Sequence, residues 1–172
     1  MATTKMLRQD GGPGERVDIL LLEDDPAHAQ AVQRAFLDSG MNSVIRWART
    51  LGEYKAFVAA QTPAIAIADL QLPDGNAVDL LTSPVEAAPF PVLIMTGFGD
   101  ERVAVEAMKA GAIEYIMKSS AAFADMPRTV ERCLREWDLL QARGRAEKAL
   151  RRESAISRFS GRKSREMEGN GS

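Results

Sequence analysis

The segment that decides the fold reads VDILLLEDDP over residues 17–26. Its short, branched apolar run is typical of a strand that is buried on both faces of a parallel sheet. Pro26 is a favourable first residue for a helix, so the three acidic residues lie where a strand gives way to a helix. This segment predicts the first half of a β–α unit.

The same alternation repeats along the chain. Further strands are predicted at about 44–48, 64–68, 91–95 and 113–117, and helices at about 51–62, 77–82, 101–110 and from Pro127 onward. Strands that alternate with helices form right-handed βαβ units around a parallel sheet. We therefore expect an α/β fold, a doubly wound five-stranded parallel sheet with helices on both faces and an extended C-terminal helix.

Length and composition suit one domain with an appendage. The chain has 172 residues, a formal net charge of -2 and one cysteine, Cys133. We expect a flexible leader at residues 1–16, a folded domain at 17–143, and a helical tail at 144–172 with a disordered end. A single cysteine excludes an intrachain disulfide, and no apolar run reaches the ~18 residues of a membrane span. These features predict a cytoplasmic protein without a membrane partner.

Polar side chains follow four of the five predicted strands. Glu23 and Asp24 follow the first strand, Asp69 ends the third, Thr96 follows the fourth and Lys118 follows the fifth. Open parallel sheets place their sites at the carboxyl ends of the strands, so these groups are expected to meet. Taken singly, each has a plainer interpretation as a helix cap, a turn residue or a solvated lysine. The joint pattern favours a site.

Three carboxylates in one cleft repel each other, and Lys118 supplies only one positive charge. A hard divalent cation complements such a cluster, and oxygen ligands favour Mg²⁺ over zinc. Asp69 could then act as a carboxylate nucleophile toward a phosphoryl group, while Lys118 stabilises the transferring oxygens. The Thr96 hydroxyl could hydrogen-bond the bound phosphoryl group.

At these residues the sequence resembles the response regulator receiver family, over roughly residues 16–143. The matching motifs are ILLLEDDP at 19–26, DLQLPDG at 69–75, VLIMTG at 92–97 and AGAIEYIMK at 110–118. The resemblance implies a flavodoxin-like sheet of strand order 2-1-3-4-5. It also implies a phosphorylation-dependent switch of two-component signalling, which is not an enzyme beyond slow self-dephosphorylation.

The resemblance also implies roles in the acidic part of the site. Asp69 is similar to the residue that a partner histidine kinase or phosphotransfer protein phosphorylates. Asp24, Asp69 and the backbone carbonyl of Gln71 would hold Mg²⁺, and Glu23 would act from the outer shell. If the alignment of the acidic run shifts by one residue, Asp25 replaces Asp24.

Three further residues take switch and phosphoryl roles through the resemblance. Lys118 and Thr96 would contact the phosphoryl group, and Tyr115 stands where the family carries a switching aromatic. A half-buried strand aromatic is the alternative for Tyr115.

Two positions depart from the family pattern. Ala77 stands where the family usually has glycine, which is tolerated only with a negative φ. Ser119 stands where a proline with a cis bond usually follows the lysine. A cis bond before serine would cost ~3 kcal/mol, so we expect either a trans bond with a shifted loop or a strained cis bond.

The C-terminal segment leaves the output open. Its apolar residues recur at heptad-like spacing, which favours a homodimer through the helix over a lone solvated helix. Basic residues are interrupted by glutamates and too few residues remain for a helix-turn-helix domain, so nucleic-acid binding is not favoured. The linker resembles helices that lead from receivers into sensory or kinase domains. The chain could therefore also be the N-terminal fragment of a longer hybrid sensor kinase.

Two other interpretations remain. A haloacid-type phosphatase usually has a second catalytic aspartate two residues after its nucleophile, where this chain has Gln71. A pseudo-receiver that never takes phosphate is disfavoured because every site position carries a chemically suitable residue. His28, the sole histidine, is interpreted as a surface residue of the first helix.

Overall fold

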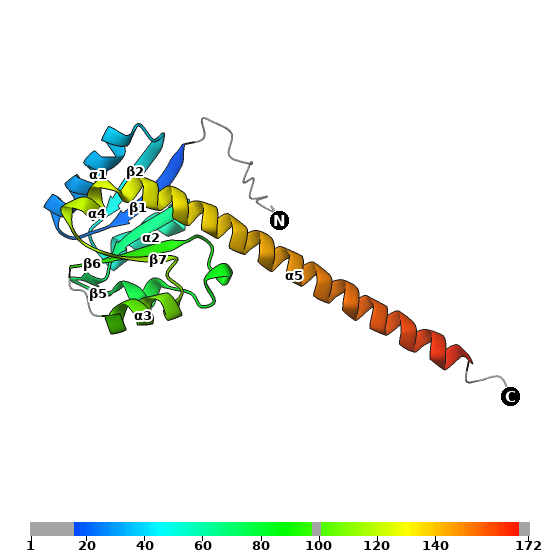
Figure 1. The fold of residues 1–172 in the computed structure, drawn as a ribbon. Coiled ribbons are helices and arrows are strands. Elements are labelled where there is room, and N and C mark those ends of the chain that lie inside the picture. Colours follow the sequence, from blue (N-terminus) through cyan, green and yellow to red (C-terminus); the bar gives the residue numbers. More distant parts are fainter. Residues whose placement is uncertain (1–15, 98–100, 169–172) are drawn as a thin grey trace. The chain divides into compact units, whose positions relative to one another are not determined.

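The structure is a computed structural model that describes residues 16–97 and 101–168. The predicted leader and the predicted disordered end fall almost wholly outside the described residues. Five parallel strands form the central sheet, in the order β2-β1-β3-β6-β7 (Figure 1). Their bounds are β1 Val17–Leu22, β2 Ser43–Ala48, β3 Ile65–Asp69, β6 Val92–Thr96 and β7 Glu114–Met117. Both the predicted fold class and the predicted strand order are confirmed.

The strands are apolar because both faces of the sheet are covered. β3 and β6 are buried along their whole length, and β1 is buried from Ile19 onward. Successive side chains of a strand point to opposite faces. Leu20 and Leu22 belong to a core cluster that also contains Leu51 and Tyr54, whereas Ile19 and Leu21 belong to the other face. The sheet therefore separates two apolar layers.

Local capping explains where the first helices begin and end. Helix α1 (Pro26–Ser39) starts after Asp25, whose side chain accepts a hydrogen bond from the backbone N–H of Ala27. It ends at Gly40, which has a φ of 71° that glycine adopts without strain. Helix α2 (Leu51–Ala60) starts after Thr50, whose hydroxyl accepts from the N–H of Glu53.

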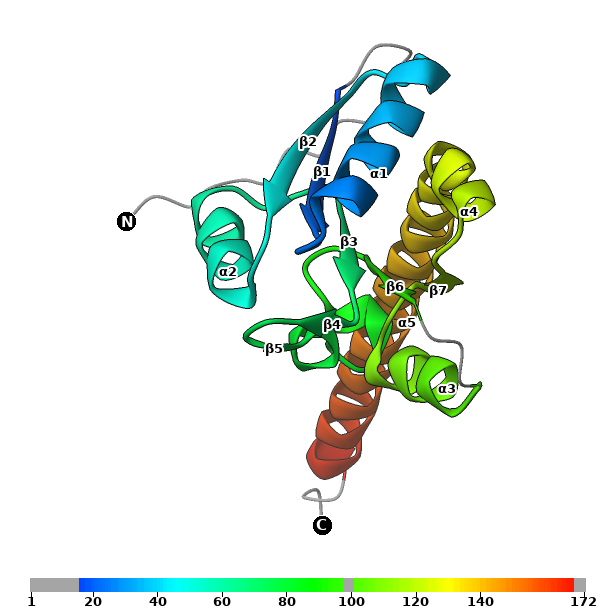
Figure 2. The same cartoon turned by 90° about the vertical axis from the view of Figure 1, so that its left-hand side faces the viewer.

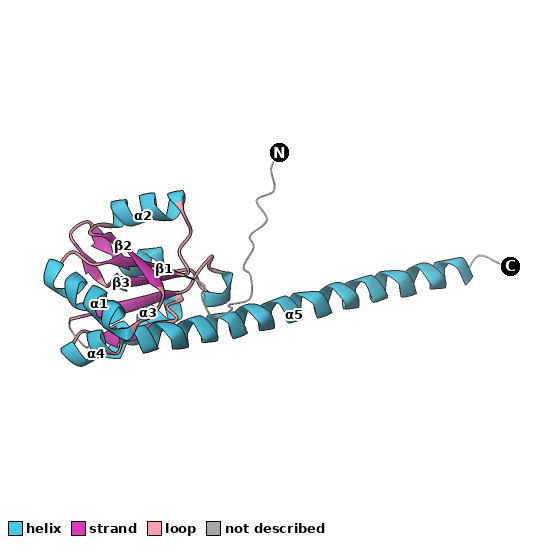
Figure 3. Ribbon diagram, turned by 90° about the horizontal axis from the view of Figure 1, so that it is seen from above, coloured by secondary structure: helices cyan, strands magenta, loops and turns pink. Residues whose placement is uncertain are grey.

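Helices cover both faces of the sheet. Figure 3 shows α2 on one side and α1 on the other, and the view in Figure 2 agrees. The remaining helices are α3 (Glu101–Ala110), α4 (Ser120–Ala124) and α5 (Met126–Glu168). The short α4 was not predicted, and it packs beside α1.

The predicted helix at about 77–82 differs from the structure. The chain instead forms a small hairpin, β4 (Gln71–Leu72) with β5 (Gly75–Asn76), and then two short 3-10 helices, η1 (Ala77–Leu80) and η2 (Val85–Ala87). Three prolines at positions 84, 89 and 91 lack the backbone N–H that a longer helix would need.

Gly111 shows how closely this irregular segment is packed. It has a φ of 111°, and a Cβ at this position would collide with the backbone carbonyl of Thr82. Only glycine permits both the conformation and the close approach.

Two compact units divide the chain between Leu134 and Arg135, and α5 contributes residues to both. The first unit contains the whole sheet. In the part of the chain that is described, no helix is long and apolar enough to cross a membrane.

Candidate functional site

The carboxyl ends of the strands bring the predicted polar groups together in the first unit. Glu23 and Asp24 follow β1, Asp69 ends β3 and Lys118 follows β7. Glu23 is fully buried and Asp69 is 8% exposed. We call the four residues Glu23, Asp24, Asp69 and Lys118 the acidic pocket.

Lys118 joins the two buried carboxylates. Its Nζ lies 2.7 Å from Asp69 Oδ2 and 2.7 Å from Glu23 Oε2, and its side chain is only 8% exposed. The backbone fixes the root of this side chain, because the N–H of Lys118 donates to the carbonyl oxygen of Thr96 at 2.7 Å. A flexible lysine is thus held in one orientation toward the carboxylates.

The pocket changes the proton affinity of its buried groups. Burial raises the pKa of Glu23, and the nearby charge of Asp69 raises it further, against the opposing effect of Lys118. Burial lowers the pKa of Lys118, but its hydrogen bonds to Asp69 and Glu23 outweigh this, so that the pKa lies above its ordinary value. The carboxylates therefore favour the charged form of Lys118, while this single positive charge does not fully offset the repulsion between the carboxylates.

The donor set fits a hard divalent cation. Carboxylate oxygens of Glu23, Asp24 and Asp69 all lie within 4.8 Å of one another. Three carboxylates face one ammonium group in the described residues, which leaves an excess of negative charge. Oxygen donors in such a group suit Mg²⁺. Gln71 opens the β4 strand two residues after Asp69, and the role of its backbone carbonyl stays a prediction.

Asp25 has a different position from Asp24. Its Oδ1 accepts a hydrogen bond from the N–H of Ala27 at 2.8 Å, which lowers the pKa of Asp25. Its own N–H donates to Glu23 Oε1 at 3.1 Å. Asp25 caps α1 and orients Glu23, and Asp24 contributes the oxygen that joins the acidic cluster.

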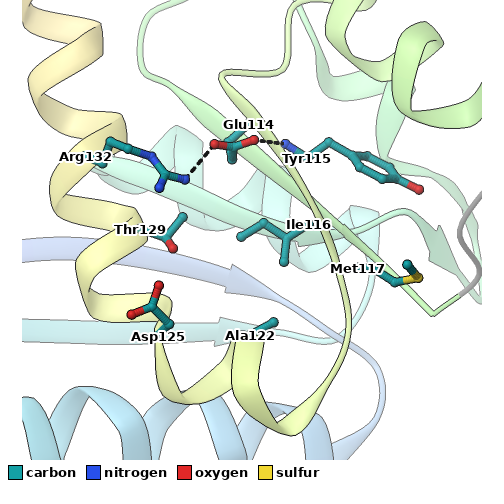
Figure 4. A pocket seen from close by; sticks show the side chains of 8 residues that line it. All are labelled: Glu114, Tyr115, Ile116, Met117, Ala122, Asp125, Thr129 and Arg132. Atoms are coloured by element: carbon teal, nitrogen blue, oxygen red, sulfur yellow. Dashed lines mark hydrogen bonds and ion pairs between the residues drawn. The ribbon is translucent and has the colours of Figure 1, made fainter. Parts of the chain in front are cut away.

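Thr96 and Tyr115 lie on neighbouring strands. Thr96 ends β6 and is 5% exposed, and Tyr115 lies beside Ile94 on the edge strand β7. Figure 4 shows the Tyr115 ring directed away from Arg132. The ring packs against the core cluster, and its buried hydroxyl has no hydrogen-bond partner among the described residues.

A shallow hollow of about 330 Å³ lies between the edge strand β7 and the start of α5. Arg132 reaches across it, and its Nη2 lies 2.7 Å from Glu114 Oε2 (Figure 4). Both side chains are partly exposed, so this ion pair adds little stability.

The two departures from the family pattern have local explanations. The peptide bond between Lys118 and Ser119 is trans, as the first of the two alternatives requires. The Ser119 hydroxyl accepts a hydrogen bond from the N–H of Ala122 at 3.0 Å and so caps α4. Ala77 is buried and, like every other described residue except three glycines, has a negative φ.

Sequence reasoning missed three residues that border the acidic pocket. His28 Nδ1 lies 3.4 Å from Lys118 Nζ, and its ring lies against Phe123 of α4. Trp47 Nε1 donates to the backbone carbonyl of Glu23 at 2.7 Å. The position of His28 could have been predicted, because it lies in the first turn of the helix that follows the acidic end of β1. Phe123 could not, because it belongs to a helix that was not predicted.

Comparisons with known proteins agree with this geometry. Residues 19–130 match the model of the response regulator receiver domain. The methanogenesis regulatory protein FilR1 of Methanothrix harundinacea is 33% identical over 73% of this chain and 29% of its own length. The photosynthetic apparatus regulatory protein RegA of Rhodovulum sulfidophilum is 32% identical over 68% of this chain and 63% of its own length. The chain thus spans less than two thirds of these relatives.

A solved structure is also similar. The CheY-like response regulator receiver domain protein of Methanospirillum hungatei superposes with a TM-score of 0.59 at 26% identity, covering 72% of this chain and 98% of that chain. Receiver domains are signalling switches of two-component systems, with an acidic pocket that binds Mg²⁺. From the family match over residues 19–130 and the parallel sheet of order 2-1-3-4-5, we conclude that the chain belongs to the response regulator receiver family.

Proposed function

We propose that this chain is a phosphorylation-operated switch that accepts a phosphoryl group on Asp69 from a partner histidine kinase or phosphotransfer protein. The observation that carries the proposal is the contact of one lysine with two buried carboxylates at the carboxyl ends of parallel strands. Such a cluster combines a carboxylate nucleophile with a fixed positive charge, which is what phosphoryl transfer needs.

Asp69 supplies the nucleophile. One of its carboxylate oxygens attacks phosphorus, a P–O bond forms to give an acyl phosphate, and the bond from phosphorus to the donor nitrogen breaks. Lys118 donates to the oxygens of the transferring group. Asp24, Asp69 and the backbone carbonyl of Gln71 would hold Mg²⁺, with Glu23 in the outer shell. When bound, Mg²⁺ neutralises charge on the phosphoryl oxygens.

Thr96 and Tyr115 carry the response in this proposal. The Thr96 hydroxyl hydrogen-bonds the new phosphoryl group and draws its loop toward Asp69. Among the described residues, the buried hydroxyl of Tyr115 has no hydrogen-bond partner. This supports a second position for the side chain, because an unmet hydrogen bond makes the present one less favourable. Slow hydrolysis of the acyl phosphate then limits the lifetime of the signal.

Mass spectrometry after treatment with acetyl phosphate and Mg²⁺ tests the acceptor. The wild type gains one phosphoryl group, the D69N variant gains none, and chelation of Mg²⁺ suppresses labelling. D79N is the matched control, because Asp79 is an exposed aspartate ten residues further along and should label like the wild type. Equal labelling of D69N and wild type removes Asp69 as acceptor, and an unlabelled wild type favours the pseudo-receiver.

We propose that the chain transmits its signal through another protein or another domain. Leu139, Leu150 and Ile156 are 64–72% exposed on the second unit, which supports a homodimer through this helix. Sedimentation at several concentrations, with the charged double variant L139E/I156E as comparison, tests it. A concentration-independent monomer would contradict the dimer.

A second candidate is a receiver within a longer hybrid sensor kinase. It is favoured by the long helix Met126–Glu168, whose sequence resembles helices that lead from receivers into sensory or kinase domains.

A further inference from the structure

We infer that His28 is a positioning residue that holds Lys118 in the acidic pocket, an inference that rests on the proposed function. His28 lies in the first turn of α1, and Lys118 follows β7 at the opposite end of the sheet order from β2. The fold therefore brings together two residues that are 90 positions apart in the sequence.

The contact has a defined chemistry. Lys118 Nζ donates a hydrogen bond to Asp69 Oδ2 at 2.7 Å and forms an ion pair with Glu23 Oε2 at 2.7 Å. The same Nζ lies 3.4 Å from His28 Nδ1. A lysine ammonium group only donates hydrogen bonds, so the inference requires the His28 tautomer that carries its proton on Nε2 and leaves Nδ1 free to accept.

The imidazole also faces two carboxylates and an aromatic ring. Glu23 Oε1 lies 3.7 Å and Asp25 Oδ2 lies 3.6 Å from the same Nδ1 atom. The ring centroid lies 5.4 Å from that of Phe123, which is 8% exposed. The ring thus rests against α4, whose N-cap is Ser119, the residue directly after Lys118.

The His28 contact differs from the Asp69 contact in what happens on phosphorylation. Asp69 loses carboxylate character when it becomes an acyl phosphate, so its pull on Lys118 changes during the reaction. The imidazole of His28 takes no part in that bond and keeps its acceptor throughout. A lysine side chain has a flexible stem of four carbons and loses much conformational freedom when it is fixed. His28 therefore restricts Lys118 to directions from which it can donate to the transferring phosphoryl oxygens.

Three variants distinguish the contribution of the His28 nitrogen acceptor from that of its aromatic ring. H28F keeps an aromatic ring against Phe123 but removes the nitrogen acceptor. H28N loses the ring but places an amide oxygen close to where Nδ1 lies. Q30A is the matched control, because Gln30 is an exposed residue of the same helix.

The experiment measures the initial rate of Asp69 labelling by acetyl phosphate and Mg²⁺, together with thermal unfolding of each variant. We expect H28F to label about five-fold more slowly than the wild type, as for loss of one hydrogen bond to a charged group at a long distance. H28N should label within about two-fold of the wild type, and Q30A at the wild-type rate.

The inference is overturned if H28F labels at the wild-type rate, or if H28N is as slow as H28F. It is also overturned if slow labelling of H28F is matched by a comparable loss of thermal stability, because the ring would then be merely structural. An unlabelled wild type would instead overturn the proposed function, and the inference with it.

Discussion

Two ionic clusters on the same sheet differ in their charge balance. The first, which we call the Arg46 cluster, contains Asp18, Arg46 and Gln61. Arg46 donates to both carboxylate oxygens of Asp18, at 2.9 and 2.8 Å, and to the backbone carbonyls of Phe57 and Gln61. The Gln61 amide donates to Asp18 at 2.9 Å. One positive charge meets one negative charge, and the guanidinium donors meet protein oxygens.

The acidic pocket lacks this balance. Glu23, Asp24 and Asp69 contribute three carboxylates, and Lys118 is the ammonium group that contacts them in the described part of the chain. Both clusters join carboxylates to a cationic side chain, and both are partly or fully buried. The difference teaches that a balanced cluster stabilises the fold by itself, whereas an unbalanced one favours the binding of a cation.

The largest expected effect comes from breaking the balanced cluster. R46A should lower the free energy of unfolding by about 3 kcal/mol, because it leaves the mostly buried Asp18 carboxylate without its cation. R46K, which keeps the charge but loses the paired geometry, should fall between R46A and wild type. Urea unfolding measures both. A loss below about 1 kcal/mol for R46A would mean that the cluster is not structural.

A smaller effect of opposite sign is expected in the acidic pocket. D69N should raise the free energy of unfolding of the metal-free protein by about 1 kcal/mol, because it removes one of three crowded carboxylates. D79N, at an exposed position, should change it by less than about 0.5 kcal/mol. Urea unfolding in a chelating buffer tests this, and a D69N variant that is less stable than D79N would contradict the excess of charge.

The smallest effects are differences in pH dependence between two carboxylates with opposite pKa shifts. The pKa of Glu23 is raised from 4.5, so the folded state holds this proton more tightly and the stability from Glu23 declines as the pH rises above 4.5. Hydrogen bonds from the N–H groups of Leu51 and Gly52 lower the pKa of Asp74 below 3.8. The stability from Asp74 is therefore present above pH 3.8 and is lost as the pH falls through its lowered pKa.

Metal-free unfolding from about pH 3 to about pH 7 distinguishes the two. The stability of wild type relative to E23Q should fall as the pH rises, and that relative to D74N should fall as the pH drops. Parallel profiles for wild type and E23Q would contradict the raised pKa of Glu23.

The sheet could be predicted from the sequence because its strands are continuous apolar runs. The helix expected at residues 77–82 could not be assigned correctly, since its local pattern is helical while the prolines that follow shorten it to 3-10 turns. The helix α4 was missed because five residues are too few to show a period, and its cap, Ser119, stood where a proline was expected.

The acidic pocket was predicted from strand ends, which the topology of a parallel sheet forces together. His28 was interpreted as a surface residue, because a single histidine on a helix carries no periodic signal. Its contacts with Lys118 and Phe123 depend on how α1 and α4 pack. The sequence of either helix alone does not determine that packing.

The most direct test of the central claim is the gain in unfolding free energy that Mg²⁺ gives to wild type, D24N, D69N and R46A. At a free Mg²⁺ concentration of ten times its Kd, the wild type should gain about 1.4 kcal/mol. R46A should gain as much, since Arg46 does not belong to the acidic pocket, whereas D24N and D69N should gain little. Equal gains for wild type, D24N and D69N, or none for the wild type, would contradict the account.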